Sequence, residues 1–200
     1  FLVPSDSPGV SVRQLAGVDL VRDYAAVEFD GVEVGSHAAV GTSSETAELV
    51  ARQTLIVQLL QCAEMVGALD TVFDMTVAWA VDRHSFGRPL ASYQALKHRF
   101  ADMKTHLEAC RAIVTQATRD VGAQAEAAAL SVSAAKAYVG EYSVNILQDC
   151  VQLHGGIGVT WEHDLHVFLR RVEVDRALFG STEEHWERLF ALAQAREERQ

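Results

Sequence analysis

The chain has 200 residues, of which 49% are apolar and 22% are charged, and its formal net charge is −10. This length and composition are typical of a globular protein with one large or two modest domains and a substantial core. The acidic balance argues against nucleic acid and against an anionic membrane surface as the main partner, because both favour a basic face.

The cysteines Cys62, Cys110 and Cys150 are far apart and odd in number, with no CxxC and no Cys/His cluster at metal-ligand spacing. The sequence therefore predicts neither a disulfide framework nor a metal site, and a reducing, cytoplasmic compartment fits best. The longest apolar run, residues 55–69, is interrupted by two glutamines and by Glu64. Those groups would be costly in lipid, so we expect no membrane span.

Before residue 40, apolar and polar residues alternate, as in "DYAAVEFDGVEV", and turns that contain Pro or Gly separate the segments. This period of two predicts β-strands. The chain also begins with Phe1-Leu2-Val3, without an initiator methionine, inside what reads as a strand. We therefore expect it to be part of a longer protein.

After residue 40 the period becomes helical, and breaks that contain Gly or Pro separate the segments. A first helix, residues 45–82, is apolar almost all round, which predicts burial among other helices. A second helix carries the seam of an antiparallel helix pair, at spacings of four and three, on Leu96, Phe100, Met103, Leu107, Cys110 and Val114. An alanine-rich helix and two shorter ones follow, over residues 124–151, 164–178 and 182–196. The last begins with Ser181-x-x-Glu184, a capping-box pattern.

Two helical segments carry motifs. "DRHSFGRPLASYQALKHRFADM" contains Arg-x-x-Phe-Gly-x-x-(Ile/Leu)-x-x-x-Gln, formed by Arg83, Phe86, Gly87, Leu90 and Gln94. "VQLHGGIGVTWEHDLHVFLRR" contains Gln-x-x-Gly-Gly-x-Gly, formed by Gln152, Gly155, Gly156 and Gly158. Both motifs resemble signatures of the acyl-CoA dehydrogenase family, and "VEFDGVEV" is similar to the strand that closes that family's middle β-domain. The motifs keep the family's order and spacing over nearly the whole chain.

The resemblance implies a mostly α fold, with an antiparallel up-and-down helical bundle preceded by a few strands of a barrel-like domain. Residues 1–40 would be the C-terminal part of the middle β-domain, and residues 41–200 the C-terminal helical-bundle domain. The N-terminal helical domain and the first β-strands of a usual member, about half of it, would lie outside this chain.

The resemblance also implies a tetramer that binds FAD at a subunit interface, where the two motifs reach a flavin held mainly by the neighbouring subunit. The cofactor-binding residues so implied are Arg83, Phe86, Gly87, Gln94, Gln152, Leu153, Gly155, Gly156 and Thr182. Arginine and glutamine side chains can donate to phosphate and ribose, and glycine lets the backbone approach a ligand. Without the resemblance, Arg83 would be read as an ion-pair partner, Phe86 as a plug for the helix turn, and Gly155-Gly156 as a tight connection.

Family members oxidise an acyl-CoA thioester to its 2,3-enoyl form, and the electrons pass through FAD to an electron-transfer flavoprotein. A carboxylate takes the α-proton, so it must contact the substrate Cα and have its pKa raised by burial. In most members this base is the Glu of a (Tyr/Phe)-Glu-Gly-Thr motif before the last helix. Here the aligned segment is "FGST", in which Gly180 stands at the Glu position. Thr182 still matches the threonine that hydrogen-bonds the flavin, whereas Glu184 replaces the glutamine expected two residues later.

Some members carry the base on the first helix of this domain, and the corresponding position here is about Val57. Both usual base positions are therefore without a carboxylate. Glu64 lies two turns further along and reads as a structural acid at a subunit contact, while Glu183 and Glu184 read as first-turn residues that complement the helix dipole. The histidines, among them His154 and His185, show no metal-ligand spacing and read as surface or interface groups.

Three hypotheses follow. The main one is a subunit without a catalytic residue in an α2β2 heterotetramer, as in bacterial members that act on bulky steroid side-chain CoA esters, where a homologous partner carries the base. The second is an active homotetramer with a relocated base, either Glu64 or Glu183. The third is a flavin-dependent monooxygenase or another redox member of the same fold, which needs no α-proton base.

Overall fold

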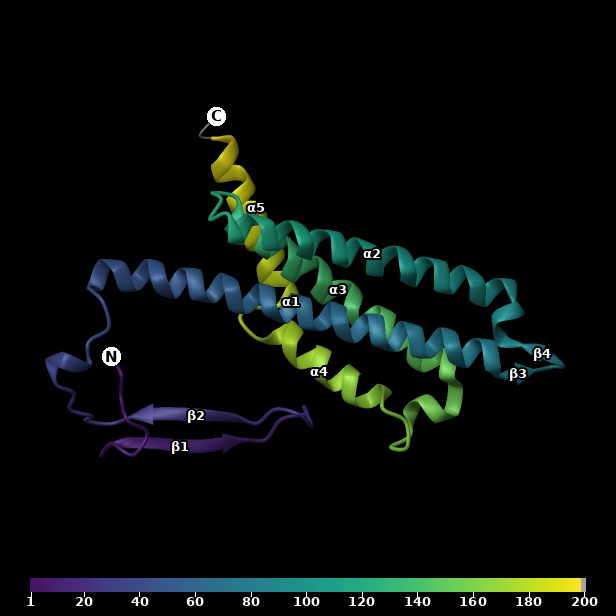
Figure 1. Ribbon diagram of the computed structural model, residues 1–200, viewed down its shortest axis with the longest axis horizontal. Coiled ribbons are helices and arrows are strands. Elements are labelled where there is room, and N and C mark those ends of the chain that lie inside the picture. The colour runs from purple at the N-terminus through teal and green to yellow at the C-terminus, as the bar shows by residue number, and fades with distance from the viewer. Residues whose placement is uncertain (199–200) are drawn as a thin grey trace.

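The structure is a computed structural model that describes residues 1–198, without the side chains of residues 43 and 44. A β-hairpin precedes a bundle of helices, and a second, very short hairpin lies at the far end of the bundle (Figure 1). The elements in chain order are β1 Val10–Leu15, β2 Tyr24–Phe29, η1 Ser36–Ala38, α1 Ser43–Asp82, β3 His84–Ser85, β4 Arg88–Pro89, η2 Leu90–Ser92, α2 Gln94–Gly122, α3 Ala128–His154, η3 Gly155–Val159, α4 Leu165–Ala177 and α5 Thr182–Glu197. This arrangement confirms the expected fold class.

Helix α1 runs the length of the bundle and packs against α2, α3 and α4 (Figure 1). It begins with a capping box formed by Thr42 and Glu45. Residues 45–82 are long and apolar enough to cross a membrane, but 50% of their most apolar window is buried inside the protein. Such burial is typical of a core helix, because the other helices already cover its apolar face.

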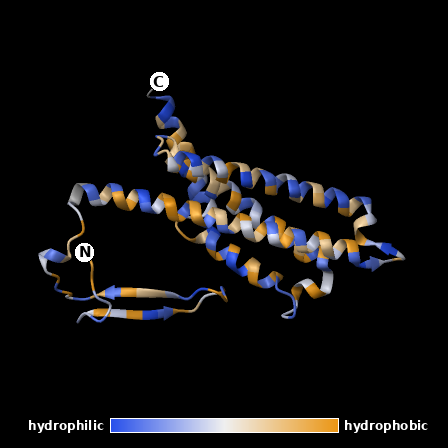
Figure 2. Cartoon of the chain, viewed as in Figure 1, coloured by the Kyte–Doolittle hydropathy of each residue, from blue (hydrophilic) through white to orange (hydrophobic). Residues whose placement is uncertain are grey.

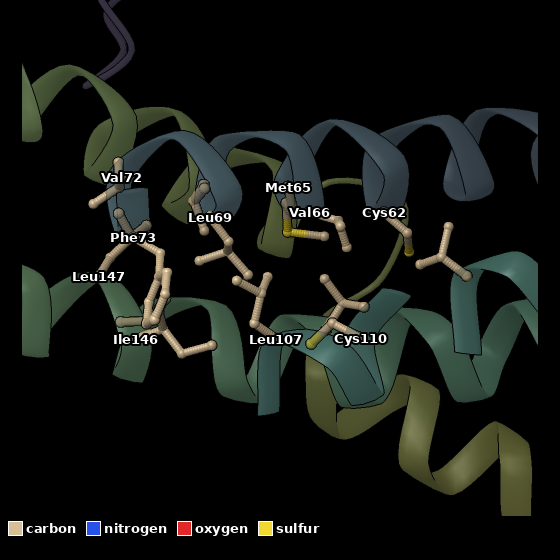
Figure 3. Packing of buried hydrophobic residues seen from close by; sticks show 14 of the residues in the cluster. Cys62, Met65, Val66, Leu69, Val72, Phe73, Leu107, Cys110, Ile146 and Leu147 are labelled. Carbon is tan, nitrogen blue, oxygen red and sulfur yellow. The ribbon is translucent and has the colours of Figure 1, made fainter. Parts of the chain in front are cut away.

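The core lies between α1, α2 and α3. Figure 3 shows Cys62, Met65 and Leu69 of α1 facing Leu107 and Cys110 of α2. The predicted α2 seam is confirmed at four positions and is only partly buried at Leu96 and Phe100; the buried positions are Met103, Leu107, Cys110 and Val114.

The β1–β2 hairpin is antiparallel, with Val12 opposite Val27. Hydrophobic residues occur on both strands (Figure 2), and Val12, Val27 and Phe29 are exposed. The expectation that the strands begin at Phe1 and continue to Val34 is wrong, because β1 starts at Val10 and β2 ends at Phe29. A two-stranded ribbon with uncovered apolar side chains needs further strands or another surface to be stable.

The loop between β1 and β2 joins the hairpin to the bundle through ion pairs. Arg22 pairs with Glu64 of α1 at 2.7 Å, and Asp19 pairs with Arg171 of α4. The proposed domain boundary near residue 40 falls between β2 and α1, and it stays a proposal. The ion pairs hold the two proposed parts together in this chain.

Candidate functional site

At one end of the bundle, near β3 and β4, α1 and α3 end and α2 begins (Figure 1). Residues of these segments line a cleft of about 630 Å³. Its lining brings together residues of both sequence motifs, although about 70 positions separate them. The residues that line it are Trp79, Arg83, Ser85, Leu90, Leu96, Arg99, Gln152, Leu153, His154, Gly155, Gly156 and Ile157. Five of the predicted cofactor-binding residues, Arg83, Gln152, Leu153, Gly155 and Gly156, therefore share one concave surface.

The backbone at the end of α3 leaves this cleft open. Gly155 has a φ of +67°, a left-handed conformation that favours glycine, and a Cβ atom at Gly155 or Gly156 would meet nothing within 4 Å. A ligand can therefore approach the main chain here without meeting a side chain. The predicted role of these glycines in close backbone approach is compatible with this geometry.

Side chains that the motifs did not single out also shape the cleft. The guanidinium of Arg83 lies over the Trp79 ring at 5.7 Å, and Arg99 pairs with Asp149 at 2.8 Å. His154 donates from Nδ1 to the Cys150 carbonyl at 2.8 Å, and its ring stacks on Trp79. Burial lowers the pKa of His154, which favours the neutral imidazole. The sequence analysis did not identify Trp79. Its position one helical turn before Arg83 places both side chains on one face at the end of α1 and could have indicated that it lines the cleft.

The other four predicted residues lie outside this lining, and three of them belong to the segment around β3, β4 and the start of α2. Phe86 and Gly87 form the turn between β3 and β4, with φ values of +50° and +80°. The Phe86 side chain is 97% exposed, so it does not plug the helix turn. Gln94 begins α2 and contacts His98 through its amide nitrogen at 2.9 Å. Phe86 thus projects into solvent next to Ser85, which lines the cleft.

The loop between α4 and α5 carries Gly180. Phe179 and Gly180 have φ values of +60° and +110°, and a Cβ atom at Gly180 would lie 2.8 Å from Nε2 of His185. The backbone and its neighbour therefore both oppose a side chain at this position. The expectation that His154 and His185 lie at the surface is wrong, since both are buried inside this chain.

Thr182 follows this loop as the first residue of α5 and is buried against Gly140 of α3. Gly140 precedes Gln152 by more than three turns of α3, roughly 18 Å along the helix axis. The chain therefore places Thr182 apart from the cleft that Arg83 lines. The capping box is confirmed, because Ser181 and Glu184 exchange side-chain and backbone hydrogen bonds of 2.7 and 3.2 Å.

Val57 and Phe179, the residue before Gly180, border one cavity. It measures about 330 Å³, and its described lining carries no carboxylate: Phe1, Val40, Thr46, Leu49, Val50, Gln53, Thr54, Val57 and Phe179. Val57, the residue at the base position on the first helix, and Phe179, the neighbour of Gly180, thus face the same space. The described residues around this cavity include no carboxyl group whose pKa burial could raise, so none of them can act as a carboxylate base there.

The acids considered as relocated bases are engaged elsewhere. Glu64 accepts hydrogen bonds of 2.7 Å from Arg22 and from Arg171, so it is a structural acid within this chain. Glu183 is exposed in the first turn of α5, as expected for a residue that complements the helix dipole. Neither side chain lines the cavity that Val57 and Phe179 border.

Comparison with known proteins identifies the family. Residues 48–192 match the model of the acyl-CoA dehydrogenase C-terminal domain. Over 133 residues the chain is 38% identical to the acyl-CoA dehydrogenase IpdE2 of Mycolicibacterium smegmatis, covering 66% of this chain and 41% of that protein. It is 35% identical to the acyl-CoA dehydrogenase FadE34 of Mycobacterium tuberculosis over 204 residues, covering 98% of this chain and 26% of the relative. The chain thus spans less than half the length of these relatives.

Solved structures show the same architecture. A chain of the ChsE4–ChsE5 complex from Mycobacterium tuberculosis superposes with a TM-score of 0.82 at 27% identity, covering 96% of this chain and 50% of that one. The structure of PigA with FAD and proline superposes with a TM-score of 0.90 at 22% identity, covering 98% and 51%. The motif residues, the helical bundle and these matches agree that the chain belongs to the acyl-CoA dehydrogenase family and carries its C-terminal helical domain.

Proposed function

We propose that the full-length protein is a subunit of an FAD-dependent acyl-CoA dehydrogenase that completes a neighbour's flavin site and lacks a catalytic base of its own. The observation that carries this proposal is the cavity between Val57 and Phe179, whose described lining holds no carboxylate. Gly180, at the usual base position, has a backbone conformation that disfavours any side chain. Abstraction of an α-proton from an acyl-CoA requires a base within contact distance.

The cleft at the end of the bundle has a donor set that suits a dinucleotide. The Arg83 guanidinium would bind a phosphate, the Gln152 amide would bind a hydroxyl or phosphate oxygen, and the Gly155–Gly156 backbone would lie against the ligand. Phe86, Gly87, Gln94 and Leu153 would extend this surface, and Thr182 would contact flavin at a separate place. FAD, when bound, accepts the hydride that leaves the β-carbon of the acyl group.

The cleft also has features of half a site. It opens at the end of the bundle, and the exposed Phe86 stands beside it. These features support a tetramer in which this surface faces a homologous subunit. Two of the similar solved structures are named for two components, the ChsE4–ChsE5 complex and the Tcur3481–Tcur3483 steroid ACAD. We therefore favour a heterotetramer with a base-carrying partner, an acyl-CoA with a bulky steroid-type acyl group, and an electron-transfer flavoprotein as electron acceptor.

Co-expression tests this function. The full-length protein would be purified alone and together with its homologous partner subunit, and bound FAD and acyl-CoA oxidation would be measured for both samples. The expected result is little or no oxidation by the protein alone, and both flavin and activity with the partner. Strong acyl-CoA oxidation by the protein purified alone would refute the proposal.

The same samples distinguish the alternatives. An active homotetramer with a relocated base predicts that acyl-CoA bleaches the flavin of this protein alone, but the ion pairs of Glu64 and the exposure of Glu183 disfavour it. A monooxygenase predicts oxygen consumption with reduced flavin that does not depend on acyl-CoA.

A further inference from the structure

Lys136 lies in the middle of α3 and is only 1% exposed. Its ammonium donates to the backbone carbonyls of Asp175 and Leu178, both at 2.8 Å, and contacts Oε1 of Gln61 at 3.4 Å. All three protons of the ammonium thus have an acceptor within the protein. Lysine is rarely buried this completely unless its charge is paired, so the position of Lys136 requires a structural explanation.

The nearby Asp175 carboxylate does not explain why the Lys136 ammonium lies where it does. The Asp175 side chain is 0% exposed, and neither of its carboxylate oxygens has a hydrogen-bond partner in the described structure. Lys136 therefore bonds the backbone of Asp175 and not its carboxylate. Burial lowers the pKa of Lys136, because desolvation disfavours the charged form, and the negative charge of Asp175 acts in the opposite direction.

The two carbonyls belong to the end of α4, where the last turn of a helix leaves acceptors without helical partners. Directly after them, Phe179 has a φ of +60°, which is strained for an aromatic residue. The Phe179 carbonyl accepts from Nε2 of Gln58 at 2.8 Å and from Nε2 of His185 at 3.1 Å. Side chains from three helices thus hold one short loop, as a strained conformation requires.

This loop forms part of the cavity that Val57 borders, and Phe179 supplies a side chain to its lining. We propose that Lys136 is a positioning residue that ties the Asp175 and Leu178 carbonyls to α3 and thereby holds Phe179 in the wall of the base-free cavity. The proposal rests on the proposed function in one respect, which is that this cavity receives the acyl group next to a flavin. The role of Lys136 in the loop stands on its own contacts.

A pair of variants isolates these contacts. The cluster around Lys136 holds the acids Asp19, Glu64 and Asp175 and the bases Arg22, Arg171 and Lys136, so its charges balance. Asp175→Asn is the matched control, because the backbone carbonyl that binds Lys136 remains. Asp175→Asn leaves two acids against three bases, and the double variant Lys136→Met with Asp175→Asn leaves two against two, so the two variants differ only in the ammonium that binds the loop and its charge.

Hydrogen–deuterium exchange of the full-length protein, in complex with its partner subunit, would compare peptides that cover residues 178–182 with peptides from the core of α1 to α3. We expect loop amides to exchange about tenfold or more faster in the double variant than in Asp175→Asn, and core amides to be unchanged. Equal exchange of the loop in both variants would overturn the proposal. The measurement needs no turnover, so its failure and a failure of the proposed function are distinguishable.

A second comparison covers the case in which the double variant unfolds. Phe179→Gly, in the Asp175→Asn background, accepts the left-handed φ without strain, so its loop needs less support. Lys136→Met should then lower the unfolding midpoint by several degrees less than it does when Phe179 is present. An equal loss of midpoint with and without Phe179→Gly would show that Lys136 serves the core alone and would overturn its positioning role.

Discussion

The two ends of the candidate site are built in opposite ways. At the end of α3, Gly155 and Gly156 leave open space, and Arg83 and Gln152 border an accessible cleft. At the α4–α5 loop, buried side chains occupy the carbonyls, and His185 lies where a side chain on Gly180 would point. The contrast separates an open surface with room for a ligand at the end of α3 from a loop in which packing leaves no room for a side chain on Gly180.

The largest effect is expected at the open end. Arg83→Ala, in the full-length protein with its partner, should weaken FAD binding by about tenfold to a hundredfold, because it removes a charged donor to phosphate. Fluorescence titration with FAD measures this change. Arg111→Ala is the control, since Arg111 pairs with Asp70 on the side of the bundle. Equal FAD affinity of the two variants would show that Arg83 does not bind the flavin.

The closed end can be tested with two glycines. Gly180→Ala combines a left-handed φ with a collision at His185, whereas Gly87→Ala has the left-handed φ and open space. Thermal and denaturant unfolding should show losses of about 2–3 kcal/mol for Gly180→Ala and about 1 kcal/mol for Gly87→Ala. Equal losses of unfolding free energy in the two variants would show that His185 does not oppose a side chain at position 180.

The acid beneath the loop predicts a pH dependence. Burial, and then repulsion by Glu64, raise the pKa of Asp175 to about 6 from a usual value of 3.8. Between about pH 4 and 6 the folded state therefore binds more protons than the unfolded state, and the free energy of unfolding falls as the pH rises through this window. Asp175→Asn should be about 1–3 kcal/mol more stable than the parent at pH 7.5 and equal to it near pH 4.

Denaturant unfolding at both pH values measures this difference. Asp70→Asn, which alters a surface pair with Arg111, serves as control and should change stability by less than about 1 kcal/mol at either pH. A difference between Asp175→Asn and the parent that is the same at pH 4 and at pH 7.5 would contradict the raised pKa of Asp175.

The smallest effect concerns the cap that follows the loop. Ser181→Ala and Thr42→Ala each remove the side-chain cap of one helix, and each should cost about 1 kcal/mol. Only Ser181→Ala adjoins Gly180, so only this variant should speed hydrogen exchange in residues 178–182. Equal exchange of that loop in both variants would mean that the loop is held without its cap.

Much of the architecture could be predicted because it is encoded locally. The period of apolar residues specified α1 and the buried positions of α2 from Met103 to Val114, since a helix brings residues three and four apart to one face. The Ser181–Glu184 capping box was equally visible, because it depends on neighbours in the chain, whereas the place of Gly180 at the usual base position is what the family resemblance implies. The strand limits were less certain, since a short edge ribbon depends on pairing more than on propensity.

The tertiary structure alone decided which distant side chains meet. Arg171 reaches Glu64 across 107 positions and Lys136 reaches Leu178 across 42, and no local pattern predicts either contact. The burial of His185 and the place of Arg99 in the cleft likewise follow from how the helices cross. Sequence by itself determined the family motifs, the helical faces and the presence of glycine at position 180. The packing of the helices brings Val57 and Phe179 to one cavity and the Lys136 ammonium to the α4–α5 loop. These contacts depend on proximity in space, which no local pattern in the sequence encodes.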